Sequence, residues 1–188
     1  MCIIAIKKRG VNFPTLECVR NMSANNPHGF AYVAKNHDTN EIEVVRTTDR
    51  EYFLKRYFFL KTHWDKKNTT MIMHCRYATH GSICQRNCHG FEKDDMYFMH
   101  NGVLGDVDVR GDKTDSETFF NDLFFPIFKK YGWGKESKNI IDAYIGYSKF
   151  AFFDNKRDDV VLFGHYVVDN EILYSNTTYL KPRYKYFA

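Results

Sequence analysis

The first six residues constrain the fold of this chain most. Met1-Cys2-Ile3-Ile4-Ala5-Ile6 places four apolar residues directly after a cysteine, and the first charge comes at Lys7. A strand with one wet face alternates apolar and polar residues, whereas an unbroken apolar run is typical of a strand covered on both faces. The chain is therefore expected to begin in the protein interior, with a layer of structure on each side of residues 2–7.

The length and composition predict a single domain that spans residues 1–188 and buries a substantial core. A hydrophobic fraction of 44% and an aromatic fraction of 17% argue against disorder. The net charge of +4 is mild, and acidic residues balance most of the lysines and arginines. The nearest basic patch is 181–185, for which a solvated tail is the simpler interpretation. No nucleic-acid partner is expected.

The same sequence predicts a cytoplasmic protein. No apolar run approaches the ~18 residues that a membrane span needs, and no charged segment followed by an apolar one opens the chain as a signal peptide would. The five cysteines are an odd number, which favours free thiols in a reducing compartment. No membrane partner is expected.

Patterns along the chain predict strands in runs, with helices inserted in two groups. One helix is expected after Pro14, and a second runs from the capping box at Thr48–Glu51, with Thr48 as the cap, to about Leu60. A third is expected over 119–125, started by the capping box at Thr114–Glu117, and Pro126 would kink or break this third helix. A fourth is expected over 137–147. Strands are expected at 2–7, 30–34, 41–46, 69–75, 96–100, 149–154, 159–163 and 171–175. Because the strands do not alternate strictly with helices, the fold class is α+β with antiparallel sheets. Two sheets with helices outside would bury Ile3, Ile4 and Ile6.

Polar residues cluster where two of these strands end. His74-Cys75-Arg76-Tyr77-Ala78-Thr79-His80-Gly81 follows one strand, and His100-Asn101-Gly102 ends another. Loops at the ends of rigid strands often carry functional residues. One interpretation is a zinc site, because histidines and cysteines, the usual zinc ligands, recur here. However, no second pair of such residues follows at the spacing typical of zinc fingers. The candidate zinc ligands are His74, His80, Cys84, Cys88 and His89.

Cys2 also has two interpretations. It can be a small buried hydrophobe at the start of a core strand. If the initiator Met1 is removed, Cys2 instead carries a thiol and a free α-amine. An α-amine has a pKa of roughly 7.7–8.0 and can accept a proton near neutrality, which is what N-terminal nucleophile chemistry needs.

Taken together, these motifs resemble a known family. They occur in the order Cys2, His-Cys-Arg-Tyr-Ala-Thr-His-Gly, Asn87-Cys88-His89-Gly90, His-Asn-Gly and Thr-Asp-Ser-Glu. This order is similar to that in the glutamine-hydrolysing domain of class II glutamine amidotransferases, which belong to the N-terminal nucleophile (Ntn) hydrolase superfamily. The resemblance runs from Cys2 to about Phe120, with a weaker match at 174–176. It implies a four-layer αββα sandwich of two antiparallel sheets flanked by helices. The compact length is similar to short standalone versions of this domain, including viral ones.

The resemblance also implies a role for each site residue. Cys2 would attack the glutamine amide to form a γ-glutamyl thioester, and Asn101 and Gly102 would form the oxyanion hole. Arg76 would bind the substrate α-carboxylate and Asp115 its α-ammonium group. Weaker expectations are that Thr79 and His80 line the substrate pocket, and that Asn26 and Gly29 shape the loop beside the Cys2 amine. No cofactor and no metal are implied.

Some features depart from the family pattern and leave alternatives open. Ala31 stands where a second glycine is usual, Phe30 is bulky, and Gly90 replaces a usual proline. The substrate can therefore be glutamine or another γ-glutamyl compound. A separate synthetase could receive the ammonia, because no acceptor-binding domain is recognisable. The rival hypothesis is an inactive module of the same fold that modulates a partner enzyme.

Overall fold

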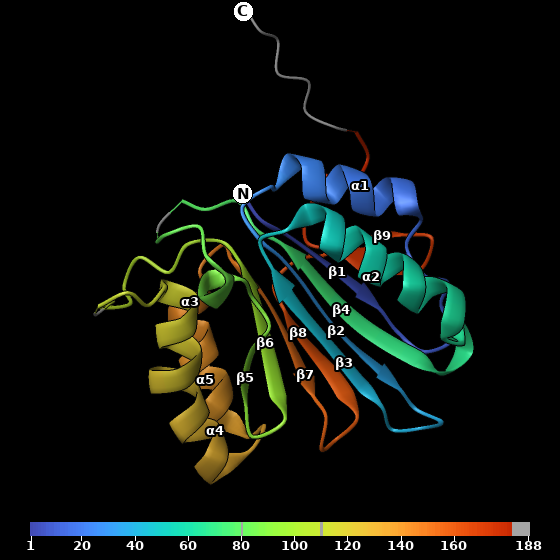
Figure 1. The fold of residues 1–188 in the computed structure, drawn as a ribbon. Helices are drawn as coiled ribbons and strands as arrows, with labels where there is room; N and C mark the ends of the chain where they lie inside the picture. The colour runs from blue at the N-terminus through green and yellow to red at the C-terminus, as the bar shows by residue number, and fades with distance from the viewer. Residues whose placement is uncertain (80, 110, 182–188) are drawn as a thin grey trace, which may run out of the picture.

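A computed structural model describes residues 1–79, 81–109 and 111–181. Two antiparallel sheets lie face to face, with helices on both outer faces (Figure 1). This confirms the predicted α+β fold and its αββα layering. The larger sheet has the order β3-β2-β4-β1-β10-β9 and the smaller one β5-β6-β7-β8. Their strands are β1 (Ile3–Lys7), β2 (Phe30–Asn36), β3 (Ile42–Thr47), β4 (Thr69–Cys75), β5 (Phe91–Lys93), β6 (Met96–Asn101), β7 (Lys149–Asp154), β8 (Asp159–Phe163), β9 (Val167–Asp169) and β10 (Ile172–Tyr174).

Strand β1 lies in the middle of the larger sheet, between β4 and β10. Ile3, Ile4, Ala5 and Ile6 have no exposed surface. Ile4 and Ile6 pack between the two sheets, while Ile3 and Ala5 pack beneath the helices. The prediction that residues 3–6 are covered on both faces is therefore confirmed. Alternate side chains of a strand point to opposite faces, and both faces of β1 are covered.

Helices α1 (Leu16–Asn25) and α2 (Arg50–His63) cover the outer face of the larger sheet (Figure 1). The expectation that Thr48 caps α2 is wrong. The cap is Asp49, whose carboxylate accepts the Tyr52 N–H at 3.0 Å. A carboxylate at the cap position is also stabilised by the positive end of the helix dipole, so Asp49 is a better cap than the adjacent Thr48.

The helices on the smaller sheet are α3 (Asp115–Thr118), the π-helical turn η3 (Phe119–Phe124), α4 (Phe125–Tyr131) and α5 (Lys135–Ile145). Thr114 caps α3 as predicted, through its hydroxyl and the Glu117 N–H. Pro126 does not end the helix. It lies in the first turn of α4, directly after η3, where its missing N–H is tolerated.

Strands β5 and β9 were not predicted. Each has three residues, which is too short for an alternating pattern to be recognised. The turn that joins β5 to β6 uses Asp94 and Asp95, both at positive φ, in place of the glycine that usually marks such a hairpin. The short 3₁₀ turns η1 (Lys66–Asn68) and η2 (Gln85–Asn87) complete the described elements.

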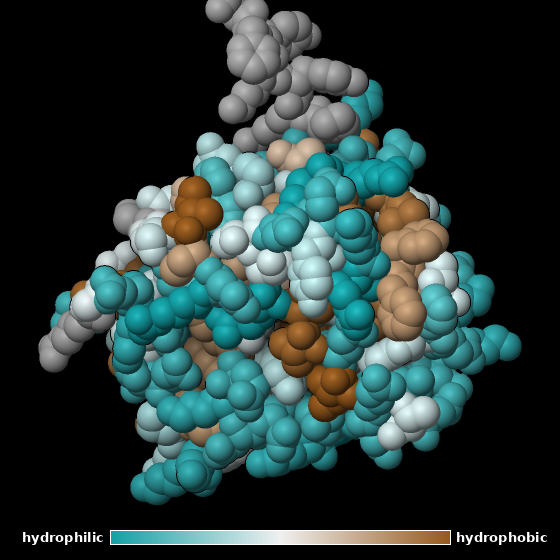
Figure 2. Space-filling model, viewed as in Figure 1, coloured by the Kyte–Doolittle hydropathy of each residue, from teal (hydrophilic) through white to brown (hydrophobic). Residues whose placement is uncertain are grey.

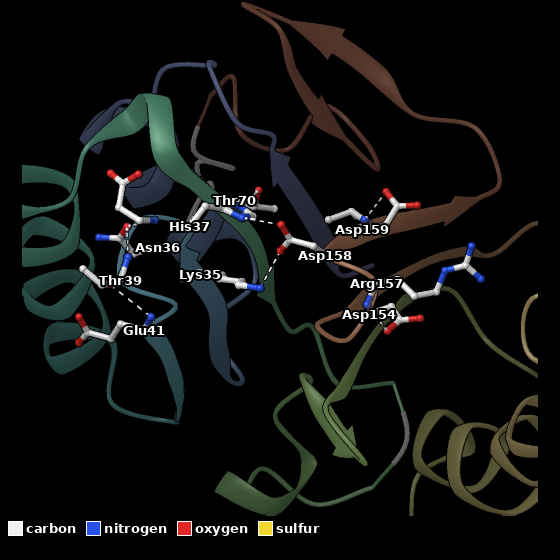
Figure 3. A network of polar contacts seen from close by, with 12 residues as sticks. Lys35, Asn36, His37, Thr39, Glu41, Thr70, Asp154, Arg157, Asp158 and Asp159 are labelled. Atoms are coloured by element: carbon white, nitrogen blue, oxygen red, sulfur yellow. Dashed lines mark hydrogen bonds and ion pairs between the residues drawn. The ribbon is translucent and has the colours of Figure 1, made fainter.

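A polar network joins the sheets at the end away from Cys2 (Figure 3). Lys35 of β2 and His37 contact the Asp158 carboxylate at 2.7 and 2.8 Å, and His37 also contacts Thr70 at 2.8 Å. Asp158 lies in the turn between β7 and β8, so these contacts tie the smaller sheet to the larger one.

The face of the molecule shown in Figure 2 is mostly hydrophilic, and apolar side chains reach it in separate small patches. Among the described residues, none of the helices has both the length and the apolar character that crossing a membrane would require.

Candidate active site

Cys2 lies at the beginning of β1, at the same end of the molecule as the last residues of β4 and β6. The antiparallel register places Ile3 opposite Cys75, so Arg76 and Tyr77 emerge beside Cys2. A cavity of about 20 Å³ is lined by Cys2, Arg76, Thr79, Gly102 and Asp115, together with Tyr77, Ala78, His89, His100, Thr114 and Ser116. Five of the predicted site residues therefore surround one small space.

The Cys2 thiol is held by the backbone of Tyr77. The Tyr77 N–H donates to Sγ at 3.3 Å, and the thiol donates to the Tyr77 carbonyl at 3.6 Å. Burial raises the pKa of the thiol, which outweighs the opposing effects of the Tyr77 amide and the Arg76 charge. The thiol is thus neutral at pH 7 and needs a base to become a nucleophile.

Two residues next to β10 fix the backbone on either side of the nucleophile. Ser175 Oγ accepts the Ile4 N–H at 2.8 Å, and the Asn176 side-chain amide donates to the Cys2 carbonyl at 2.6 Å. These two residues correspond to the weak sequence match at 174–176. The contacts of Ser175 with Ile4 and of Asn176 with Cys2 come from the pairing of β1 with β10.

Gly102 occupies a position that only glycine fits. Its φ is +155°, and an added Cβ would lie 2.0 Å from Ser148 Oγ and 2.9 Å from His100 Nε2. The requirement for glycine therefore comes from the packing of Ser148 and His100, in addition to any approach of a substrate.

Asn101 is buried, and its amide has one unused atom. Nδ2 donates to Ser175 Oγ at 2.8 Å, while Oδ1 has no hydrogen-bond partner among the described residues. Because Ser175 Oγ already accepts from Ile4, its own proton is free to donate. Rotation of the Asn101 amide by about 180° lets Ser175 donate to Oδ1 and leaves Nδ2 as the free atom. The rotated amide has the free N–H donors that an oxyanion hole needs.

Arg76 and Asp115 are held in place by the protein's own polar groups. Arg76 is buried, and its Nη1 donates to the Ser82 carbonyl at 2.9 Å. Asp115 Oδ2 accepts the Leu104 N–H at 2.8 Å, and Oδ1 accepts the Ser116 N–H at 2.8 Å. Asp115 thus fixes the loop that follows Gly102 while it faces the cavity.

The weaker predicted residues have mixed placements. Gly29 packs against Cys88 and Arg76, and its carbonyl accepts the Arg76 N–H at 2.7 Å. Asn26 caps the end of α1, and its amide donates to the Met22 carbonyl at 2.9 Å. Asn26 is not among the residues that line the cavities at Cys2. His80 lies outside the described residues.

The comparisons with known proteins agree with this geometry. Residues 29–147 match the family model "Glutamine amidotransferases class-II". The chain belongs to this family. A solved structure, the glutamine phosphoribosylpyrophosphate (PRPP) amidotransferase from B. subtilis complexed with ADP and GMP, has the same fold, with a TM-score of 0.59 and 15% identity. The match covers 95% of the chain described here and 42% of the B. subtilis chain. No curated protein sequence matches significantly.

Apart from naming His74 and His89 as candidate zinc ligands, the sequence analysis gave no role to three buried histidines, His74, His89 and His100. The rings of His74 and His89 stack at 3.9 Å, and His89 Nδ1 accepts the His100 N–H at 3.0 Å. Burial lowers the pKa of His74 to about 3 and that of His100 to about 4, so both rings are neutral. Burial also lowers the pKa of His89, and His89 and His100 form an uncharged wall of the small cavity.

The zinc alternative gains no support from the described part of the chain. There, no three His, Cys, Asp or Glu side chains lie close enough together to share a metal ion. His74 and His89 instead stack on each other, and Cys88 donates to the Thr47 carbonyl at 3.2 Å.

Proposed function

We propose that this protein is a cysteine-dependent glutamine amidohydrolase or amidotransferase in which Cys2, after removal of Met1, forms a γ-glutamyl thioester. The observation that carries the proposal is the meeting of Cys2, Arg76, Gly102 and Asp115 around one cavity. Met1 is 58% exposed, so an aminopeptidase can reach it. We infer that residues 1–188 act as one glutaminase domain in the cytoplasm.

The neutral state of the half-buried Cys2 thiol explains why Met1 must leave. While Met1 is attached, the Cys2 nitrogen is an amide and accepts no proton. Once free, the α-amine takes the thiol proton, directly or through a water molecule, and the thiolate attacks the amide carbon. The C–N bond then breaks, and the departing nitrogen takes the proton and leaves as ammonia. Water hydrolyses the thioester to glutamate and restores the thiol.

The surrounding residues would bind the substrate and stabilise the transition state. Arg76 would bind the α-carboxylate in two parallel hydrogen bonds, and Asp115 would pair with the α-ammonium group. Asn101 Nδ2, in its rotated orientation, and the Gly102 N–H would bind the oxyanion. Thr79 and His80 would line the pocket, and Asn26 and Gly29 would support the loop beside the Cys2 amine. No cofactor takes part in these steps.

The acceptor of the ammonia is a second part of the proposal. The chain spans 42% of the length of the amidotransferase that shares its fold. We propose, as membership of the family allows, that the ammonia is released to water or passes to a separate synthetase.

The rival function is an inactive module that modulates a partner enzyme. A cavity of about 20 Å³ favours it, because such a space has room for about one water molecule rather than an amino acid. If the protein is an enzyme, Arg76, Asp115 or the loop that carries Thr79 must move outward to admit the substrate.

Three measurements test the proposal. Intact mass of the purified protein shows whether Met1 is lost. Incubation with glutamine should release glutamate and ammonia, and Cys2→Ala should abolish this release. A diazoketone analogue of glutamine should label Cys2.

The matched control is Cys84→Ala. A hydrogen bond with Ser82 lowers the pKa of the Cys84 thiol, so Cys84 is the thiol that would compete with Cys2 for the label. This variant should keep full activity and full labelling. If Met1 is retained and no glutamate is released, the proposed enzymatic function is overturned and the rival function, an inactive module, is favoured.

A further inference from the structure

A second and much larger cavity also reaches Cys2. It has a volume of about 590 Å³, within the usual range for small-molecule sites. Cys2, Tyr77, Thr79 and Gly102 line both cavities, so the reacting sulfur lies between them. Of these two cavities, the small one alone is lined by Arg76 and Asp115, the residues proposed to bind the amino-acid end of the substrate.

The large cavity opens at the side from which the leaving nitrogen departs. Met1 lines it, and Met1 is bonded to the Cys2 nitrogen that becomes the α-amine. That amine must lie within hydrogen-bond reach of the departing nitrogen in order to give it a proton. A substituent on the nitrogen would therefore extend into the space that Met1 leaves.

The lining of this cavity is suited to an apolar group. Tyr77, Val103, Tyr144 and Tyr147 contribute large side chains. Among the residues that the structure describes, the charged ones in its lining are Asp106 and Lys149, of opposite sign. Ammonia needs neither the volume nor the aromatic side chains. Apolar and aromatic linings with a few polar groups are typical of sites that bind an organic ligand.

We propose that the preferred substrates are γ-glutamyl amides whose amine carries an aromatic or other apolar substituent, with that substituent bound in the large cavity. The inference rests on the proposed function of Cys2 and names its substrate class. The γ-glutamyl group forms the thioester, the amine leaves with the proton from Cys2, and water then releases glutamate.

The test compares γ-glutamylbenzylamide with glutamine on the same preparation of the full chain without Met1. We expect kcat/KM for the benzylamide to be at least tenfold higher than kcat/KM for glutamine. The discriminating variant is Gly105→Phe. Gly105 lines the cavity, an added Cβ would meet nothing within 4 Å, and its φ lies outside the left-handed region. The ring should fill the cavity and lower the benzylamide-to-glutamine ratio of kcat/KM at least tenfold.

Two further variants secure this reading. Val103→Phe narrows the cavity from a half-exposed position and should lower the same ratio if Gly105→Phe fails to fold. Val168→Phe, at an exposed position of β9 that lines neither cavity, should leave the ratio unchanged.

The possible failures are distinguishable. Cleavage of glutamine with a benzylamide ratio below one, or a ratio that neither cavity variant changes, overturns this inference and leaves the proposed function standing. If neither compound is cleaved and the diazoketone does not label Cys2, both are overturned.

Discussion

Ser175→Ala should impair the chemical step far more than substrate binding. The Ser175 hydroxyl accepts the buried Ile4 N–H at 2.8 Å and lies 2.8 Å from the Asn101 amide. Its removal takes away the group that, in the rotated orientation of the Asn101 amide, would bind Oδ1 and leave Nδ2 free. Loss of one oxyanion donor typically costs about 10²–10³ in kcat, so a partly misdirected amide should cost about 10–10². KM should change less than threefold, because Ser175 does not line the small cavity.

The same substitution has a separate effect on stability. It leaves the Ile4 N–H buried without a partner, which costs about 1–3 kcal/mol. Urea denaturation measures this cost, and steady-state glutamine hydrolysis measures kcat and KM. Ser175→Thr keeps the hydroxyl and should restore most of kcat, which loss of stability alone would not explain.

The outcome that would refute the reasoning is specific. A Ser175→Ala enzyme with kcat within threefold of the parent would show that Asn101 does not depend on Ser175. A fall in kcat that Ser175→Thr fails to restore would show that the hydroxyl is not the group that matters.

Three further predictions follow from contacts in the structure. Gly102→Ala should destabilise the fold by about 1–3 kcal/mol in urea, since its Cβ would overlap Ser148, and an unchanged midpoint would contradict the packing. Arg76→Lys should raise KM for glutamine about tenfold, because lysine cannot form two parallel hydrogen bonds to a carboxylate, and an unchanged KM would remove Arg76 from the binding site. Burial raises the pKa of Asp158, but Lys35 and His37 outweigh it and hold that pKa below 3.8. Asp158→Asn should therefore lose about 1 kcal/mol at pH 7, and the difference from the parent should vanish as pH falls through the depressed pKa; an equal difference at pH 7 and in strong acid would contradict this.

The sequence predicted those features that local patterns encode. The apolar run at residues 3–6 required cover on both faces, and the structure supplies helices on one face and the second sheet on the other. The cap at Thr114 was also local, since the residue and its partner N–H are three positions apart. Where two caps competed, as at Thr48 and Asp49, the pattern alone could not decide which backbone N–H each side chain would reach.

The parts of the candidate site that the sequence could not predict depend on distant pairing. Ser175 and Asn176 contact residues 171 and 174 positions away, which only the β1–β10 register brings within reach. The stacking of His74 on His89 needs the two sheets to be packed first. The large cavity beside Cys2 is built from four separate segments, so no single motif encodes it.

These long-range contacts explain how Cys2, the proposed nucleophile, can be held firmly although it lies next to the N-terminus. Chain ends usually fray unless they are tied into a sheet. Here Ile3 and Ile4 are anchored in two different cores, Ser175 holds the Ile4 N–H, and Asn176 holds the Cys2 carbonyl. None of these contacts uses the Cys2 nitrogen. Removal of Met1 can therefore free the amine without loosening the thiol, and activation needs no further rearrangement of β1.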